Sequence, residues 1–221
     1  MIYINKNREP QKLLHYRKTK DAHYDNMPTD VKDELRESLM REQGYICAYC
    51  MKQLNNNKLV KIEHIKPRNP KDNSGNAKDT LDYKNMVAVC DGNKGAPLKN
   101  TTCDTHRGNT EFKKLTPFKK EIIDKIKYRH NGEIFSEDIE INEDLNERLN
   151  LNCSAVSLPE CRAAALNHLI KELSSEKERG NWNINMLKKY RKKYEQLHNG
   201  RYTPYLGIIL WYLDLRIKKF R

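Results

Sequence analysis

The chain has 221 residues, of which 37% are hydrophobic and 33% charged, and its 42 Lys and Arg against 30 Asp and Glu give a formal net charge of +12 at pH 7. A chain of this size can bury a core, either as one domain or as a small module with an extension. The positive excess favours a polyanionic partner, because neutralising phosphates releases condensed counterions, although a merely soluble basic surface is the alternative. No apolar run approaches the roughly 20 residues needed to span a bilayer, and no secretory signal is visible, so we expect a cytoplasmic protein.

The first 44 residues are expected to form a short strand followed by two helices. Residues 1–4 are an apolar run typical of a strand, and Pro10 introduces a basic helix that either lies along a phosphate backbone or faces solvent. A second helix is predicted from Pro28 to about Gly44. Proline and acidic residues favour its start, and apolar residues recur on one side of it.

Two strands separated by a long polar loop are predicted next. Residues 59–65 are predicted to form a strand, in which successive side chains point to opposite faces. Glu63 and His64 would then point to opposite faces unless the strand ends there, as Pro67 allows. Residues 67–80 contain almost no apolar side chain and are expected to form the loop.

The second strand is expected over residues 82–90, followed by a turn over residues 91–95. A helix should then start around Cys103 or Asp104 and continue to about Leu115. The predicted order is therefore strand, long loop, strand and helix.

Six cysteines in a chain without an export signal favour metal ligation over disulfides. Redox chemistry is the rival use of a Cys-x-x-Cys pair. Four cysteines that bracket a Glu-His pair instead favour one structural zinc ion, whose four thiolates leave no open position for a substrate. These four are Cys47, Cys50, Cys90 and Cys103. The other two, Cys153 and Cys161, are expected to be ordinary buried thiols.

A second set of residues in the same stretch suits a harder ion. Oxygen ligands and imidazole fit a divalent cation such as Mg²⁺ or Mn²⁺, and a neutral imidazole can also act as a base. The set consists of Glu63, His64, Asn85, Asp104 and His106.

With these residues the chain resembles the HNH nuclease module of the ββα-metal type, in the variant that carries four zinc-binding cysteines. The literal H, N and H would be His64, Asn85 and His106, and the predicted order of elements is the one that this fold requires. The flanking residues resemble one branch, the PtuB nucleases of retron and Septu anti-phage systems. The resemblance covers most of the chain and is specific over residues 43–108. The matching segments are Ile4 to Pro10, Cys-Ala-Tyr-Cys followed by Glu-His-Ile-x-Pro, Cys-Asp before Arg-Gly, and Leu149 to Asn152 followed by Arg162.

The resemblance implies a role for each residue of the second set. His64 would be the general base that deprotonates a water molecule, and Asn85 would fix the loop and orient the imidazole through a carbonyl–imidazole contact. Glu63, together with His106 or Asp104, would hold the Mg²⁺ or Mn²⁺ ion on the scissile phosphate. Many HNH modules have Asn or His where this chain has Asp104, and His106 follows two positions later, so the second ligand stays open. Arg107 is expected to be either a phosphate clamp or a solvated basic residue.

The region after Pro117 is expected to be mainly helical. Residues 122–135 fit a hairpin around an Asn-Gly turn, with a helix over residues 117–128 as the competitor. Further helices are predicted over residues 141–151, 159–173, 183–197 and 204–217. The fold class is therefore α+β, with the N-terminal arm and nuclease module over residues 1–116 and a helical, partner-docking region over residues 117–221.

Two features of this region have two interpretations each. A basic run near residue 190 fits nucleic acid or a solvated helix face. A set of apolar residues at helical spacing fits either a partner's groove or the core: Ile208, Trp211, Tyr212 and Leu215.

We therefore predict a metal-dependent HNH endonuclease that hydrolyses phosphodiester bonds of DNA in an anti-phage system. The PtuB resemblance implies a partner ATPase of the PtuA type. An RNA nuclease that attacks tRNA is the alternative among enzymes, because HNH chemistry does not require deoxyribose. A non-catalytic zinc module that binds nucleic acid is the alternative from another class. The presence of Glu63, His64 and His106 together argues against it, since binding needs no base beside a hard-ion ligand.

Overall fold

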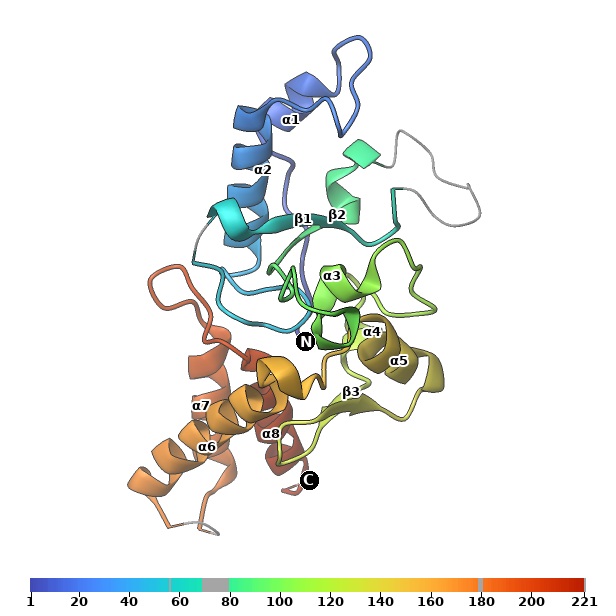
Figure 1. Ribbon diagram of the computed structural model, residues 1–221. Helices are drawn as coiled ribbons and strands as arrows, with labels where there is room; N and C mark the ends of the chain where they lie inside the picture. Colours follow the sequence, from blue (N-terminus) through green and yellow to red (C-terminus); the bar gives the residue numbers. More distant parts are fainter. Residues whose placement is uncertain (56, 69–79, 179–180, 221) are drawn as a thin grey trace.

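The computed structural model describes residues 1–55, 57–68, 80–178 and 181–220. Helices α1 (Gln11–Tyr16) and α2 (Thr29–Glu42) lie at one end of the molecule, and helices α6 (Leu158–Glu176), α7 (Ile184–Glu195) and α8 (Leu206–Lys218) lie at the other (Figure 1). Strands β1 (Lys61–His64) and β2 (Met86–Val89) and helix α3 (Cys103–Arg107) lie between them. One hydrophobic core extends through both ends. The α+β class is confirmed, with small sheets and many helices.

The N-terminal helices begin where the prolines predict. α1 follows Pro10 and α2 follows Pro28, because proline fixes a φ angle that suits the first turn and lacks the amide that this turn leaves unpaired. The strand predicted over residues 1–4 is wrong, since these residues belong to neither sheet of the described chain. Their side chains at Met1 and Ile4 are buried, and the Ile4 amide donates to the Pro117 carbonyl at 2.9 Å.

The two central strands form an antiparallel pair in which Lys61 faces Val89 and His64 faces Met86. They are shorter than predicted, because the 3₁₀ turns η1 (Asn57–Leu59) and η3 (Tyr83–Asn85) precede them. β1 ends at His64, as the proline three residues later allows. Most of the predicted loop, residues 69–79, lies outside the described residues.

Helix α3 is much shorter than the predicted helix to Leu115. It ends at Arg107, and the next residue, Gly108, has φ 56° and ψ −133°, a combination that only glycine adopts readily. Residues 109–115, which were predicted to continue the helix, therefore lie outside it.

Both alternatives for the segment after Pro117 occur in part. A short helix α4 (Lys120–Ile123) is followed by a hairpin of β3 (Ile126–Tyr128) and β4 (Ile134–Ser136), which pair as Ile126–Ser136 and Tyr128–Ile134. Helix α5 (Ile139–Glu143) continues directly into the π-helix η5 (Asp144–Arg148), and the 3₁₀ turn η6 (Ser154–Val156) leads to α6.

Helices α6, α7 and α8 pack together, and the basic run of α7 is largely paired within this group. Lys189 contacts Glu176 at 3.2 Å and Lys193 contacts Glu172 at 2.8 Å, both on α6, while Arg191 pairs with Asp214 of α8. This pairing favours the interpretation of these residues as a surface of the helical region. None of the helices in the described residues is both long enough and apolar enough to cross a membrane.

Candidate metal centre and active site

The four predicted zinc ligands converge on one point. The Sγ atoms of Cys47, Cys50, Cys90 and Cys103 all lie within 4.8 Å of one another, and all four side chains are buried. The separations are 3.9 Å for Cys47–Cys103 and 3.7 Å for both Cys50–Cys90 and Cys90–Cys103. Thiolates about 2.3 Å from a tetrahedral ion are about 3.8 Å apart, so the cluster fits one soft metal ion such as zinc. Contacts with Cys47 and the other thiols, together with burial, raise the pKa of Cys103 well above its usual value, which a bound cation would counteract.

A turn anchored to α2 and β2 presents Cys47 and Cys50. Ile46 and Gln53 form an isolated β-bridge around it, and the Cys47 amide donates to the Lys52 carbonyl at 2.9 Å. The buried amide group of Gln43, at the end of α2, donates to the carbonyls of Ile46 and Ala88 and accepts from the Ala88 amide. Gln43 thus fixes the turn on β2, which leads directly to Cys90.

Gly92 brings the second pair of cysteines together. It has φ +63°, and a Cβ atom there would lie 2.2 Å from the Thr102 carbonyl oxygen. The Thr102 amide in turn donates to the Gly92 carbonyl at 3.0 Å. Only glycine allows this approach, which places Cys90 beside Cys103.

Glu63 is buried on β1, at 5% exposure. Its carboxylate accepts from the Tyr49 hydroxyl at 3.0 Å and pairs with the Arg107 guanidinium at 2.5 Å. Burial raises the pKa of Glu63 well above its usual value; Arg107 opposes this rise, and the neighbouring Asp104 carboxylate adds to it. Arg107 pairs with Glu63 and Lys61 with Asp104, and these two cations partly offset the repulsion between the neighbouring carboxylates.

Asp104 and His106 point to different parts of the site. The Asp104 carboxylate lies near Glu63 and accepts from Lys61 Nζ at 3.1 Å. The His106 ring instead directs Nδ1 to the Leu98 carbonyl, at 3.0 Å, and to the Thr101 hydroxyl, at 3.3 Å. Residues two positions apart on a helix face nearly opposite directions, and the structure brings Asp104, not His106, beside Glu63.

His64 is buried at the end of β1, at 3% exposure. Its Nε2 atom lies 2.9 Å from the Thr80 carbonyl oxygen, and the Tyr24 ring packs against it edge to face, with the two ring centroids 4.8 Å apart. Because a carbonyl only accepts, Nε2 carries the proton and Nδ1 is left as the basic nitrogen. Burial lowers the pKa of His64 to about 4, so the imidazole is neutral at neutral pH.

Asn85 fixes the chain that follows β1. Its Oδ1 accepts from the Lys66 amide at 2.8 Å, its Nδ2 donates to the Lys66 carbonyl at 3.1 Å, and its backbone carbonyl accepts from the Ile65 amide. The side chain therefore holds the segment two residues beyond His64. The carbonyl that bonds the imidazole belongs to Thr80.

Sequence reasoning missed the role of Arg107. The side chain is buried, pairs with Glu63, and donates to the carbonyls of His64 and Ile65 at 2.7 and 2.9 Å. It is neither solvated nor free to act as a clamp in this arrangement, and instead joins α3 to the end of β1. Two sequence signals pointed toward the site: its place four residues after Cys103, on the same face of the helix, and its position before Gly108 in the Cys-Asp and Arg-Gly segment.

Comparison with known proteins supports a nuclease. No family model matches the chain. A curated Escherichia coli protein named "Retron Ec83 putative HNH endonuclease" is 29% identical over 125 residues, which cover 51% of this chain and 48% of that protein. The chain thus spans about half the length of the curated relative that it matches. The resemblance to HNH nucleases is therefore supported by a distant relative that carries this name.

Proposed function

We propose that the protein is a metal-dependent HNH endonuclease that cleaves phosphodiester bonds of DNA in anti-phage defence. The observation that carries the proposal is the pair of neighbouring carboxylates, the buried Glu63 and the partly buried Asp104, together with a buried, neutral His64 next to Glu63 on β1. A binding module needs neither a pair of neighbouring carboxylates nor an imidazole with one nitrogen kept basic. The net charge of +12 suits a nucleic-acid substrate.

Glu63 and Asp104 fit a Mg²⁺ or Mn²⁺ ion, because carboxylate oxygens are the ligands that these ions prefer and a cation offsets the repulsion of the two groups. A divalent cation held there supplies positive charge that stabilises the phosphate oxygens in the transition state. The four cysteines fit a separate structural zinc ion.

In the proposed reaction His64 Nδ1 accepts a proton from the attacking water molecule. The Thr80 carbonyl keeps the ring in the required tautomer through Nε2, and the Tyr24 ring limits its rotation. Asn85 holds the backbone after β1, so that the imidazole keeps its direction relative to the carboxylates. Arg107 maintains the position of Glu63 against α3.

The substrate is tested by incubating purified protein and Mg²⁺ or Mn²⁺ with plasmid DNA, single-stranded DNA and total tRNA in parallel. Cleavage of DNA that EDTA abolishes supports the proposal. Cleavage of tRNA alone favours the RNA nuclease instead, and binding without cleavage of any substrate favours the non-catalytic module.

We expect Asp104→Asn to lower the cleavage rate by about 10²-fold or more, because it removes a charged ligand from the ion. His106→Ala is expected to have a much smaller effect, since its ring bonds the turn at residues 98–101. Steady-state rates at saturating Mn²⁺ compare the two variants. A larger loss in His106→Ala than in Asp104→Asn would assign the second ligand to His106.

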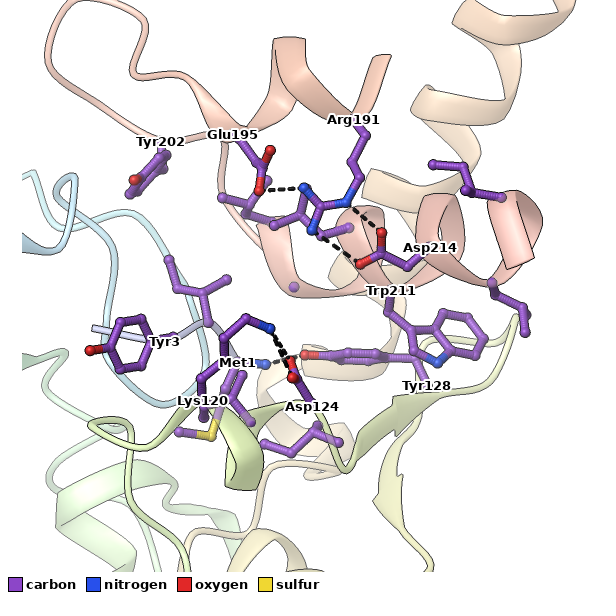
Figure 2. Close-up of a pocket in the computed structure, with 18 of the residues that line it drawn as sticks. Met1, Tyr3, Lys120, Asp124, Tyr128, Arg191, Glu195, Tyr202, Trp211 and Asp214 are labelled. Carbon is purple, nitrogen blue, oxygen red and sulfur yellow. Dashed lines mark hydrogen bonds and ion pairs between the residues drawn. The ribbon is translucent and has the colours of Figure 1, made fainter. Parts of the chain in front are cut away.

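Docking of a partner ATPase of the PtuA type through the helical region stays a prediction. A pocket of about 590 Å³ lies between the N-terminal segment, β3 and helices α7 and α8, and Figure 2 draws the side chains that line it. Trp211 lines it and packs edge to face on Tyr128, with centroids 5.9 Å apart. Leu215 also lines the pocket and is 39% exposed, whereas Ile208 and Tyr212 are buried in the core. The four apolar residues are thus divided between an open face and the core.

We expect Trp211→Ala to weaken complex formation with the partner while the isolated protein melts at nearly the same temperature, since tryptophan at an interface carries much of the binding energy. Ile208→Ala is the matched control on the same helix. It removes a fully buried side chain and should destabilise the protein by about 2–5 kcal/mol. Thermal melts and a pull-down with the ATPase measure both effects. Equal destabilisation by the two variants would contradict docking through Trp211.

A further inference from the structure

Helix α3 carries Cys103 and Asp104 but has only five residues, too few to hold its own position. Its first residue, Cys103, has φ +54°, a conformation that L residues rarely adopt. The support comes from a segment far along the chain, because the Cys103 amide donates to the Leu149 carbonyl at 2.9 Å. The start of the helix is thus fixed from outside.

Asn150 holds the turn that leads into α3. Its Nδ2 atom donates to the Lys99 carbonyl at 3.0 Å and to the Thr101 carbonyl at 2.9 Å. Thr101 precedes Asp104 by three residues, and its hydroxyl also contacts the ring of His106. One side chain therefore bridges two carbonyls immediately before the fourth cysteine and the proposed ligand.

The segment that contains Asn150 is itself firmly anchored. Leu149 and Leu151 are fully buried, and the buried Arg162 of α6 donates to the Leu151 carbonyl and the Asn152 side chain, both at 2.9 Å. Asn150 has φ +47°, which asparagine tolerates better than most residues. The anchoring fixes the direction of its side chain toward the turn.

We propose that Asn150 is a positioning residue for the metal site, which sets the place of Asp104 relative to Glu63 through the carbonyls of residues 99 and 101. The inference rests on the proposed function, because Asp104 is the ligand that it positions. It means that the part of the chain after residue 117 completes the active site in addition to packing against it.

The test is Asn150→Gly, which removes both side-chain hydrogen bonds while glycine keeps the positive φ without strain. Asn199→Gly is the matched control. Asn199 also has a positive φ, of 52°, and lies exposed between α7 and α8. Zinc content, the melting temperature and the Mn²⁺ dissociation constant (by electron paramagnetic resonance) are measured on proteins of all 221 residues. The cleavage rate is followed as a function of Mn²⁺ concentration.

In Asn150→Gly we expect full zinc content and a Mn²⁺ dissociation constant raised by about 10–100-fold, as is typical when the support of a metal ligand is lost. The cleavage rate should recover partly at high Mn²⁺. Asn199→Gly should match the wild type in every measurement. Mn²⁺ affinity in Asn150→Gly equal to that in Asn199→Gly overturns the proposal, as does wild-type protein that binds no Mn²⁺.

If Asn150→Gly loses zinc or unfolds, Asn150→Asp replaces it. Aspartate keeps the size of the side chain and tolerates positive φ, but its carboxylate cannot donate to the two carbonyls. Weakened Mn²⁺ binding in folded Asn150→Asp supports the proposal, and loss of zinc in both variants would show that the segment serves folding alone, which overturns it. Wild-type protein that binds Mn²⁺ but cleaves no nucleic acid refutes the proposed function, whereas the Mn²⁺ constants still decide the role of Asn150.

Discussion

His64→Ala is expected to lower the cleavage rate by at least the roughly 10²–10⁴-fold that a general base contributes. Nucleic-acid binding should change little, because a base acts on the transition state and not on ground-state contacts. The ring is buried against Tyr24 and the Thr80 carbonyl, so a modest fall in melting temperature should accompany the loss. Single-turnover cleavage, filter binding and thermal melts measure the three quantities.

His15→Ala provides the control for loss of a histidine, since His15 lies exposed on α1. Added imidazole should restore part of the activity of His64→Ala, because the vacated space accepts a small base, whereas it should not affect His15→Ala. Substantial turnover by His64→Ala at neutral pH without imidazole would assign the base to another residue.

Removing the proposed zinc ion, or replacing one of its proposed ligands by Cys47→Ser, is expected to unfold the module. Structural zinc contributes about 10–16 kcal/mol in zinc-finger peptides, which is comparable with the whole free energy of unfolding of a typical domain, about 5–15 kcal/mol. The four thiols also lie in the core, where they connect α3, β2 and the turn after α2. Zinc content by elemental analysis and melting by circular dichroism should therefore fall together.

Cys161→Ser is the matched control, because Cys161 is half-buried on α6 and lies outside the cluster. It should retain one zinc ion per chain and melt nearly as the wild type does. Well-folded protein without zinc, or a Cys47→Ser variant that melts normally, would contradict the structural role of the cluster.

Local signals in the sequence were sufficient for the longer elements and for the cysteine cluster. Pro28 predicted the start of α2, and the helices predicted over residues 159–173, 183–197 and 204–217 correspond to α6, α7 and α8. The cysteine cluster was predicted because a Cys-x-x-Cys pair and two further cysteines that bracket a Glu-His pair are typical of a zinc site. These features depend on near neighbours in the chain or on residue types with one dominant use.

The details of the candidate active site depended on contacts between distant residues, which no local pattern encodes. Spacing alone showed that Asp104 and His106 face different directions, but only the packing of α3 against β1 decided that Asp104 faces Glu63. The hydrogen bond to the His64 ring comes from the backbone carbonyl of Thr80. Every residue carries such a carbonyl, so the sequence does not indicate which one will bond the imidazole.

The same limit explains Arg107 and Asn150. Composition suggests that an arginine faces water or phosphate, whereas the tertiary structure buries Arg107 and pairs it with Glu63 because the charge of each offsets the desolvation of the other. The sequence predicted Asn150 only as part of a helix over residues 141–151, and only the approach of residues 149–152 to the turn before α3 gives its side chain two carbonyls to bind. The sequence by itself determined which chemical groups are present and most of the helices. The tertiary structure decided which of those groups meet, because burial and long-range hydrogen bonds select among the partners that local patterns leave open.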